Sequence, residues 1–115
     1  MTRAIAIVVL LTASLLALPG AAQEATFTNV PMIDTMCSAK AAADPDGHTL
    51  ACALQCQGSG FGILTENGDF LKFDAAGNDR ALQLLKSTSQ QSKLRVSVSG
   101  TRKGDTLAVK EIRLL

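Results

Sequence analysis

The stretch FGILTENGDFLKF, residues 61–73, decides the fold class of this chain. Residues 61–65 and 70–73 are rich in aromatic and aliphatic side chains, which is typical of β-strands. Asn67-Gly68 stands between them, and both residue types tolerate the positive φ angles of a type I′ turn. The stretch therefore predicts a β-hairpin.

A helix is expected after this hairpin. Asn78 or Asp79 can cap its N-terminus, and the helix is predicted to run to about Ser87. Its apolar positions recur with helical spacing and form one stripe that can face the core, made of Ala81, Leu82 and Leu85.

A second hairpin is expected at the C-terminal end of the sequence. Residues 94–99 alternate apolar and polar side chains, which is typical of a strand with one buried face. Residues 100–104 turn the chain, and residues 106–114 run back. The apolar positions of this last strand change phase near Lys110-Glu111, and a β-bulge there would keep both sets on the buried side.

The segment before residue 61 is less regular. Residues 26–33 are expected to form a strand, which Pro31 weakens or places at a sheet edge. Residues 34–60 contain every cysteine and the single histidine, and residues 49–57 are predicted to form a short helix that Gly58 ends at the C′ position. With this insert set aside, the order β-β-β-α-β-β predicts a mainly β protein with some α, a small OB-like five-stranded barrel.

The N-terminal residues have the features of a cleavable export signal. Arg3 precedes an apolar run over residues 4–18, and small side chains at residues 20–22 suit a signal peptidase. The run is shorter than the roughly 20 residues that cross a bilayer, although an uncleaved membrane helix is the competing interpretation. No cysteine follows the run to carry a lipid. We therefore predict a signal peptide at 1–22 and a single mature domain at 23–115, which is periplasmic or extracellular and has no membrane anchor after cleavage.

Composition excludes several classes of function. The chain carries 11 Lys and Arg against 10 Asp and Glu, and removal of Arg3 leaves the mature domain with ten of each. A neutral domain with four Phe, no Trp and no Tyr offers neither the charge nor the stacking surface of a nucleic-acid-binding protein. One histidine and no G-x-S-x-G sequence leave no hydrolase triad. We therefore expect no nucleic-acid partner and name no catalytic residue.

The residues with distinctive chemistry are Cys37, His48, Cys52 and Cys56, in the pattern C-x10-H-x3-C-x3-C. Thiolate and imidazole groups bind Zn(II), and thiolates also select Cu(I). Met36, beside Cys37, can also bind Cu(I), although methionine is more often core filler. The clustering predicts an exported cell-envelope binding protein that holds a soft metal ion, Zn or Cu, with the cysteines and the histidine.

One helix through residue 48 would exclude a site with all four ligands. At a rise of about 1.5 Å per residue, His48 and Cys56 would lie about 12 Å apart along the axis, too far for metal bonds of about 2.0–2.3 Å. If the helix begins at Thr49, His48 lies in the preceding loop and can fold back. Otherwise Cys37, Cys52 and Cys56 form one cluster without the histidine.

A disulfide is the alternative use of the cysteines, because two neighbouring thiols in an oxidising compartment usually pair. Cys37 with Cys52 or Cys56 would close a loop worth about 3 kcal/mol in the chain-entropy treatment and leave one thiol free. That arrangement indicates a disulfide-stabilised interaction module that binds an envelope protein or a glycan, without metal. Thiol redox catalysis is a third interpretation, which the absence of a C-x-x-C pair disfavours.

The insert also resembles a group of small exported bacterial domains. Their pattern is D-x-x-C, then G-x-x-H-x-x-C-A-x-x-C and a Gly, followed by a hairpin, a helix and a closing V-x-V-x-G hairpin. The matching residues here are Asp34, Cys37, Gly47, His48, Cys52, Ala53, Cys56, Gly60, Val96, Val98 and Gly100. The chain departs from the pattern around His48, with three residues before Cys52 instead of two and the glycine directly before the histidine. The resemblance implies the OB-like fold, export and the three cysteines as a set, and no particular activity.

Overall fold

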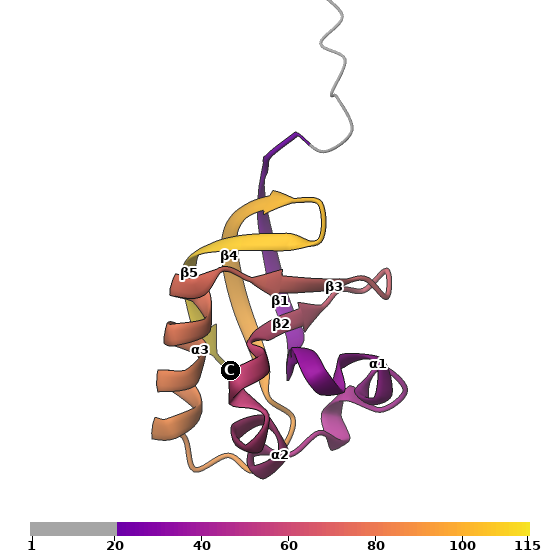
Figure 1. The fold of residues 1–115 in the computed structure, drawn as a ribbon, viewed down its shortest axis with the longest axis vertical. Helices are drawn as coiled ribbons and strands as arrows, with labels where there is room; N and C mark the ends of the chain where they lie inside the picture. The colour runs from indigo at the N-terminus through magenta and orange to yellow at the C-terminus, as the bar shows by residue number, and fades with distance from the viewer. Residues whose placement is uncertain (1–20) are drawn as a thin grey trace, which may run out of the picture.

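The computed structural model describes residues 21–115, so residues 1–20 of the predicted signal peptide lie outside the described part of the chain. Five strands form a closed barrel in the order β1-β2-β3-β5-β4, with β4 returning to β1 (Figure 1). The strands are β1 Gln23–Asp34, β2 Phe61–Leu64, β3 Phe70–Phe73, β4 Arg95–Lys103 and β5 Thr106–Leu114. Neighbouring strands are antiparallel except β3 and β5, which are parallel. The predicted mainly β, OB-like five-stranded barrel is confirmed.

The barrel encloses the hydrophobic core. Val96 and Val98 of β4 are buried, whereas Ser97 and Ser99 are only half-buried, as the period of a strand with one inward face requires. The other strands contribute in the same way, and their buried residues are Val30, Met32, Phe61, Ile63, Leu71, Phe73, Leu107 and Val109.

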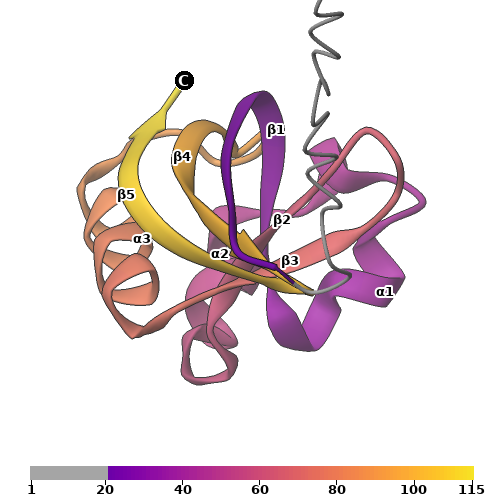
Figure 2. The ribbon, with the colours of Figure 1, turned by 90° about the horizontal axis from the view of Figure 1, so that it is seen from above.

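The bulge predicted in β5 is confirmed at Lys110. Ser99 of β4 stands opposite Glu111, and Gly100 stands opposite Val109, so Lys110 is the extra residue. The extra residue lets the apolar side chains on both sides of the bulge contact the core, although they differ in phase along the strand. Figure 2 shows β4 and β5 curving together around the barrel.

Strand β1 is longer than predicted and changes its partner along its length. Residues up to Pro31 pair with β4, whereas residues 32–34 pair with β2. Asn29, with a φ of 56°, lies at a break in the β4 register. Pro31 therefore stands at the change of partner, and the strand ends at Asp34, where the insert begins.

The predicted hairpin over residues 61–73 is confirmed, but its turn is not type I′. Gly68 has a positive φ of 86°, whereas Asn67 does not. The Thr65 N–H donates to the Asp69 carbonyl at 2.8 Å, and the Thr65 Oγ1 accepts the Asp69 N–H at 3.1 Å. Because the threonine hydroxyl satisfies one of the loop N–H groups, it stabilises a longer turn than the Asn-Gly pair alone suggests.

Helix α3, Ala75–Ser87, begins earlier than predicted. Asp74 is its N-cap, and the Asp74 Oδ1 accepts the Gly77 N–H at 2.9 Å, so the prediction of Asn78 or Asp79 as the cap is wrong. Glycine has a low helix propensity, but Gly77 lets the helix approach β5 closely. A Cβ at this position would lie 2.6 Å from Val109 Cγ2.

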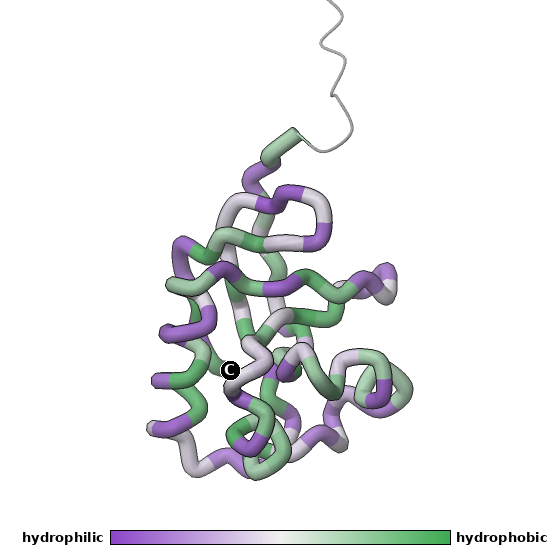
Figure 3. The backbone as a smooth tube through the Cα atoms, in the orientation of Figure 1, coloured by the Kyte–Doolittle hydropathy of each residue, from purple (hydrophilic) through white to green (hydrophobic). Residues whose placement is uncertain are grey.

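The apolar stripe predicted on α3 is confirmed. Ala81 and Leu85 are buried, and Leu82 is partly buried against the core. In Figure 3 the hydrophilic residues of this helix lie on the side away from the barrel, as expected for a helix that packs on a core through one face. Among the described residues, no helix has the length and apolar character needed to cross a membrane.

The insert between β1 and β2 is a series of short helical segments at one end of the barrel (Figure 1). They are η1 Thr35–Cys37, α1 Ser38–Ala41, η2 Pro45–Gly47, α2 Leu50–Gln55 and η3 Gln57–Ser59, where η denotes a 3₁₀ helix. Helix α2 is shorter than predicted, and Gly60, not Gly58, has the left-handed φ, at 80°. Leu50 and Ala53 of α2 are buried in the core, so the insert closes this end of the barrel.

An ion pair also fixes the insert to β4. Arg95 Nε and Nη2 donate to the two carboxylate oxygens of Asp46 in η2, at 2.8 and 3.2 Å. Arg95 Nη1 donates to the Asn29 carbonyl at 2.8 Å. The hydrogen bonds from Arg95 hold the pKa of the Asp46 carboxyl below its usual value. The insert is thus held by a charged contact as well as by its buried apolar residues.

Candidate metal centre

Asp34, the last residue of β1, is completely buried where the insert begins. Its Oδ2 accepts the Cys37 N–H at 3.0 Å, which caps η1, and its Oδ1 accepts the His48 Nε2–H at 2.6 Å. A carboxylate is stable in such a position only when hydrogen-bond donors replace water. Asp34 was not among the predicted ligands, although the D-x-x-C pattern contains it.

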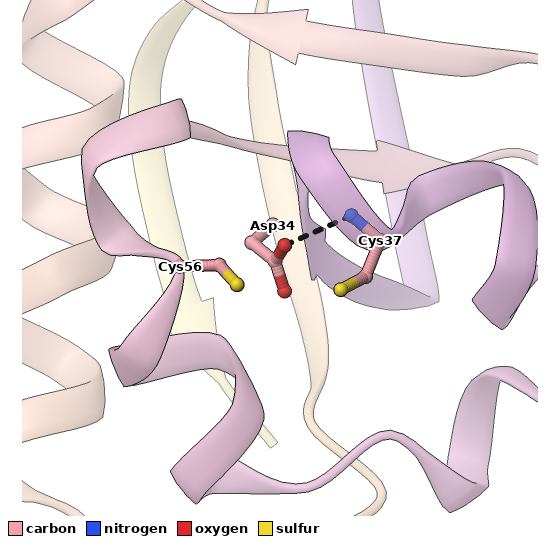
Figure 4. A group of neighbouring side chains, drawn as sticks. All are labelled: Asp34, Cys37 and Cys56. Atoms are coloured by element: carbon pink, nitrogen blue, oxygen red, sulfur yellow. Dashed lines mark hydrogen bonds between the residues drawn. The ribbon is translucent and has the colours of Figure 1, made fainter.

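Three potential metal ligands meet at this point. A carboxylate oxygen of Asp34 and the Sγ atoms of Cys37 and Cys56 all lie within 4.8 Å of one another. Figure 4 shows the two sulfur atoms on either side of the Asp34 carboxylate, with Cys37 in η1 and Cys56 at the end of α2. Carboxylate and thiolate are ligands of Zn(II), and thiolates also bind Cu(I). The group can therefore hold a metal ion.

Hydrogen bonds hold η1 against η3. The Ser59 hydroxyl accepts the Met36 N–H at 3.1 Å and donates to the Cys56 carbonyl at 2.8 Å. The Thr35 N–H donates to the Gly60 carbonyl at 2.9 Å. The two segments that carry Cys37 and Cys56 are thus fixed relative to each other without any contribution from the thiols.

Met36 lies at the solvent-facing edge of this group. Its Sδ is 3.8 Å from Cys56 Sγ, and the residue is 71% exposed. Methionine side chains commonly fill apolar cores. The exposed position of Met36 is therefore not explained by packing.

The surroundings of Cys37 disfavour its thiolate. Burial is the main cause that raises the pKa of the Cys37 thiol, and together with the neighbouring Asp34 carboxylate and Cys56 thiol it brings the pKa to about 11. The thiol is therefore protonated at neutral pH, which argues against a role as a nucleophile. A cation bound between Asp34 and the two thiols would offset this repulsion and replace the thiol protons.

Two of the predicted ligands, Cys52 and His48, are not part of this group. Cys52 is exposed, and both residues line a hollow of about 250 Å³ next to Cys37. Because α2 begins at Leu50, His48 lies in the preceding loop and folds back, but its Nε2 is engaged by Asp34. The structure thus brings Cys37 and Cys56 together, adds Asp34, and leaves Cys52 and His48 at the margin.

All three cysteines are free, and the described residues contain no disulfide. The Sγ atoms of Cys37 and Cys56, within 4.8 Å, would have to approach to about 2.05 Å to form one. Cys52 lies outside that group. Of the two predicted pairings of Cys37, the geometry favours the one with Cys56.

No protein-family model matches the chain, and no match was found among curated proteins or solved structures. The resemblance to small exported bacterial domains therefore stays a prediction. Asp34, Cys37 and Cys56 are the described residues whose geometry indicates a function.

Proposed function

We propose that this chain is an exported cell-envelope protein that binds one soft metal ion, Zn(II) or Cu(I). Cys37 and Cys56 supply two thiolates, and Asp34 offers a carboxylate oxygen. One observation carries the proposal. A carboxylate oxygen of Asp34 and the Sγ atoms of Cys37 and Cys56 come from separate parts of the chain and all lie within 4.8 Å of one another. Thiolates are ligands of both ions, and a carboxylate oxygen is a ligand of Zn(II).

The spacing of the donor atoms supports the proposal. Bonds of about 2.3 Å to sulfur and about 2.1 Å to oxygen, at tetrahedral angles, place two donors of one ion about 3.6–3.8 Å apart. The donors of Asp34, Cys37 and Cys56 all lie within 4.8 Å of one another. The largest separation among them therefore exceeds the spacing around one ion by no more than about 1 Å.

His48 supports the site through Asp34. Ligand carboxylates are commonly oriented by hydrogen bonds from neighbouring groups. Here the His48 Nε2–H and the Cys37 N–H each bond to one oxygen of Asp34 and fix the plane of the carboxylate. Each oxygen keeps a further lone pair for a metal ion. In this proposal His48 is a positioning residue, the two thiolates are ligands, and Asp34 offers a carboxylate oxygen beside them.

Export gives the site its chemical context. Residues 1–22 are predicted to direct the chain to the periplasm or the cell exterior, where neighbouring free thiols tend to be oxidised. A bound ion would keep Cys37 and Cys56 reduced. The proposed partners are accordingly the metal ion itself, or an envelope protein that delivers or receives it.

Metal content and thermal stability test the proposal. Native mass spectrometry of the reduced mature chain is expected to show one bound Zn(II) or Cu(I) ion, and loading should raise Tm because the ion binds the folded state. Cys37→Ser and Cys56→Ser should each abolish loading. Cys52→Ser, which alters an exposed thiol outside the group, is the matched control and should retain it. A reduced protein whose mass and Tm do not change with either ion would refute the proposal.

The proximity of Cys37 and Cys56 also favours a second candidate function. Joined as a disulfide, they would close a loop worth about 3 kcal/mol of stability, and the chain would be an interaction module that binds an envelope protein or a glycan. The number of free thiols distinguishes the metal-binding protein from the disulfide-stabilised module. It is counted after a chelator has removed any metal, under denaturing, non-reducing conditions. All three cysteines react if the site is kept reduced, and only Cys52 reacts if the disulfide is present.

A further inference from the structure

We infer that Met36 supplies a thioether ligand to the same site, which therefore prefers Cu(I) to Zn(II). This inference rests on the proposed metal binding at Cys37 and Cys56, and it names the ion. The observation that carries it is an exposed methionine sulfur beside a ligand thiol.

The distance between the sulfur atoms suits a shared ion. Two sulfurs bound to one ion at about 2.3 Å lie about 3.8 Å apart at a tetrahedral angle and about 4.0 Å apart in a trigonal plane. Met36 Sδ and Cys56 Sγ lie 3.8 Å apart. Cys37 Sγ is within 4.8 Å of Cys56 Sγ. Cys56 thus has sulfur neighbours from two residues of η1.

The position of Met36 is set by the backbone. The Ser59 hydroxyl joins the Met36 N–H to the Cys56 carbonyl, with distances of 3.1 and 2.8 Å. This bridge keeps the two residues side by side before any ion binds. A preformed pair of sulfur donors loses less freedom when it takes up an ion than two independent side chains would.

The exposure of Met36 distinguishes it from a structural methionine. In the described part of the chain, the exposed large apolar side chains are Met36, at 71%, and Leu115, at 47%, the final residue. Met32 of β1, by contrast, is 2% exposed and belongs to the core. A thioether that faces solvent beside a thiol is placed to meet a soft ion that arrives from outside the protein.

The two ions would use different third donors. Zn(II) is bound by thiolate, imidazole and carboxylate, so it would take an oxygen of Asp34. Cu(I) selects thiolate and thioether sulfur, so it would take Met36 and leave Asp34 to its hydrogen bonds with His48 and Cys37. A change at Met36 should therefore affect the affinity for Cu(I) and not the affinity for Zn(II).

Affinity measurements on the reduced mature chain test this inference, with competition against a chromogenic chelator for each ion in the absence of oxygen. Met36→Leu is expected to weaken Cu(I) binding on the order of tenfold and to leave Zn(II) binding unchanged. Met32→Leu makes the same change at a buried methionine and is the matched control, which should alter neither affinity. X-ray absorption should count three sulfur ligands around Cu(I) in the wild type and two in Met36→Leu.

The outcomes separate this inference from the proposed function. Because Met36 is exposed, Met36→Leu should keep the metal-free Tm of the wild type. If its Cu(I) affinity and sulfur count also equal those of the wild type, while Cys37→Ser and Cys56→Ser lose the ion, Met36 is not a ligand and the proposed function stands. A wild type that binds Zn(II) more tightly than Cu(I) overturns the preference. A wild type that binds neither ion overturns both proposals.

Discussion

At the scale of single residues, Asp34 connects three features of the candidate site. It caps η1 through the Cys37 N–H, it holds the His48 ring, and its charge contributes to the raised pKa of the Cys37 thiol. The carboxylate is completely buried, so its partners must replace the water that it would otherwise bind. One side chain therefore organises the local fold and sets the electrostatics that a cation would meet.

The thiols are expected to react with iodoacetamide at different rates in the metal-free, reduced protein. The thiolate is the reactive form, and burial and Asp34 raise the pKa of Cys37 to about 11, whereas Cys52 is exposed. At about pH 8, Cys37 should be modified at least about tenfold more slowly than Cys52. Peptide mass spectrometry over time gives both rates.

A substitution at Asp34 tests the electrostatic part of this difference. Asp34→Asn keeps the size of the side chain and one oxygen to accept the Cys37 N–H but removes the charge, so alkylation of Cys37 should become faster while Cys52 stays unchanged. Equal rates at Cys37 and Cys52 in the wild type would contradict the raised pKa.

At the scale of elements, the insert depends on η2 as well as on α2 for its attachment to the barrel. The Lys93 N–H donates to the Asp46 carbonyl at 3.1 Å, and the Leu50 N–H donates to the Gln91 carbonyl at 2.8 Å. Together with the ion pair of Asp46 and Arg95, these bonds join the insert to the chain that leads into β4. The candidate ligands Cys37 and Cys56 are therefore carried by segments with fixed positions.

The ion pair of Asp46 and Arg95 predicts a stability effect that depends on pH. Arg95 lowers the pKa of the Asp46 carboxyl in the folded state, so the pair stabilises fully above the unfolded value of about 3.9 and is lost as pH falls through the lower folded value. Both side chains are about a third exposed, which screens the pair. Asp46→Asn should therefore cost about 0.5–1 kcal/mol at neutral pH and almost nothing near pH 2. Urea unfolding at both pH values measures the difference.

Glu24→Gln is the matched control for this effect. Glu24 pairs with Lys110 at 2.8 Å, but both side chains are at least 60% exposed, so the loss of stability should be smaller than in Asp46→Asn. The same cost for Asp46→Asn at neutral pH and near pH 2 would show that the carboxylate charge plays no part.

Local sequence patterns predicted the strands better than the ends of the helices. Apolar and polar side chains alternate over residues 94–99, and the apolar positions of residues 106–114 change phase at Lys110. Both patterns reflect contacts with the core that repeat along each strand. The start of α3 depends on a distant contact, because its cap Asp74 also accepts the Val109 N–H of β5 at 3.2 Å. Asp74, Asn78 and Asp79 are all cap-type residues, and this contact between residues 35 positions apart cannot be read from the local sequence that would have to choose between them.

The candidate site was predictable only in part. Cys37 and Cys56 stand out in the sequence because thiols are metal ligands. An aspartate that follows a strand is commonly only a helix cap. The fold is needed to show that Asp34 is buried beside the two cysteines. Cys52 was expected in one cluster with Cys37 and Cys56, but in the structure it is exposed on α2 and lies outside the group that Asp34 forms with the other two thiols.

At the scale of the whole molecule, the barrel separates the candidate site from the β4–β5 hairpin. Figure 1 shows this hairpin at the end of the barrel opposite α1 and α2. Gly100 of the hairpin stands opposite Ala25 of β1, and Asp34 lies at the far end of that strand. At the rise of a strand, this separation is up to about 30 Å. Changes in the hairpin should therefore alter stability without altering the ligands.

Gly100 is the position where β4 and β5 approach too closely for a side chain. A Cβ there would lie 2.1 Å from the Ala108 carbonyl oxygen and 3.1 Å from Val109 Cα. Backbone atoms cannot move aside as a flexible side chain does. Gly100→Ala is thus expected to lower the free energy of unfolding by about 1–3 kcal/mol, and Tm by about 4–8 °C for each kcal/mol. Thermal unfolding followed by circular dichroism measures this change.

Gly58→Ala in η3 is the matched control for Gly100→Ala. No atom lies within 4 Å of its Cβ position, and its φ is not left-handed, so the variant should have the wild-type Tm or a slightly higher one, because alanine reduces the entropy of the unfolded chain. Metal loading per folded molecule should be unchanged in both variants, since both keep Asp34, Cys37 and Cys56. A Gly100→Ala protein with the wild-type Tm would contradict the close approach of the strands. A loss of metal loading at temperatures where that variant is folded would contradict the separation of the hairpin from the site.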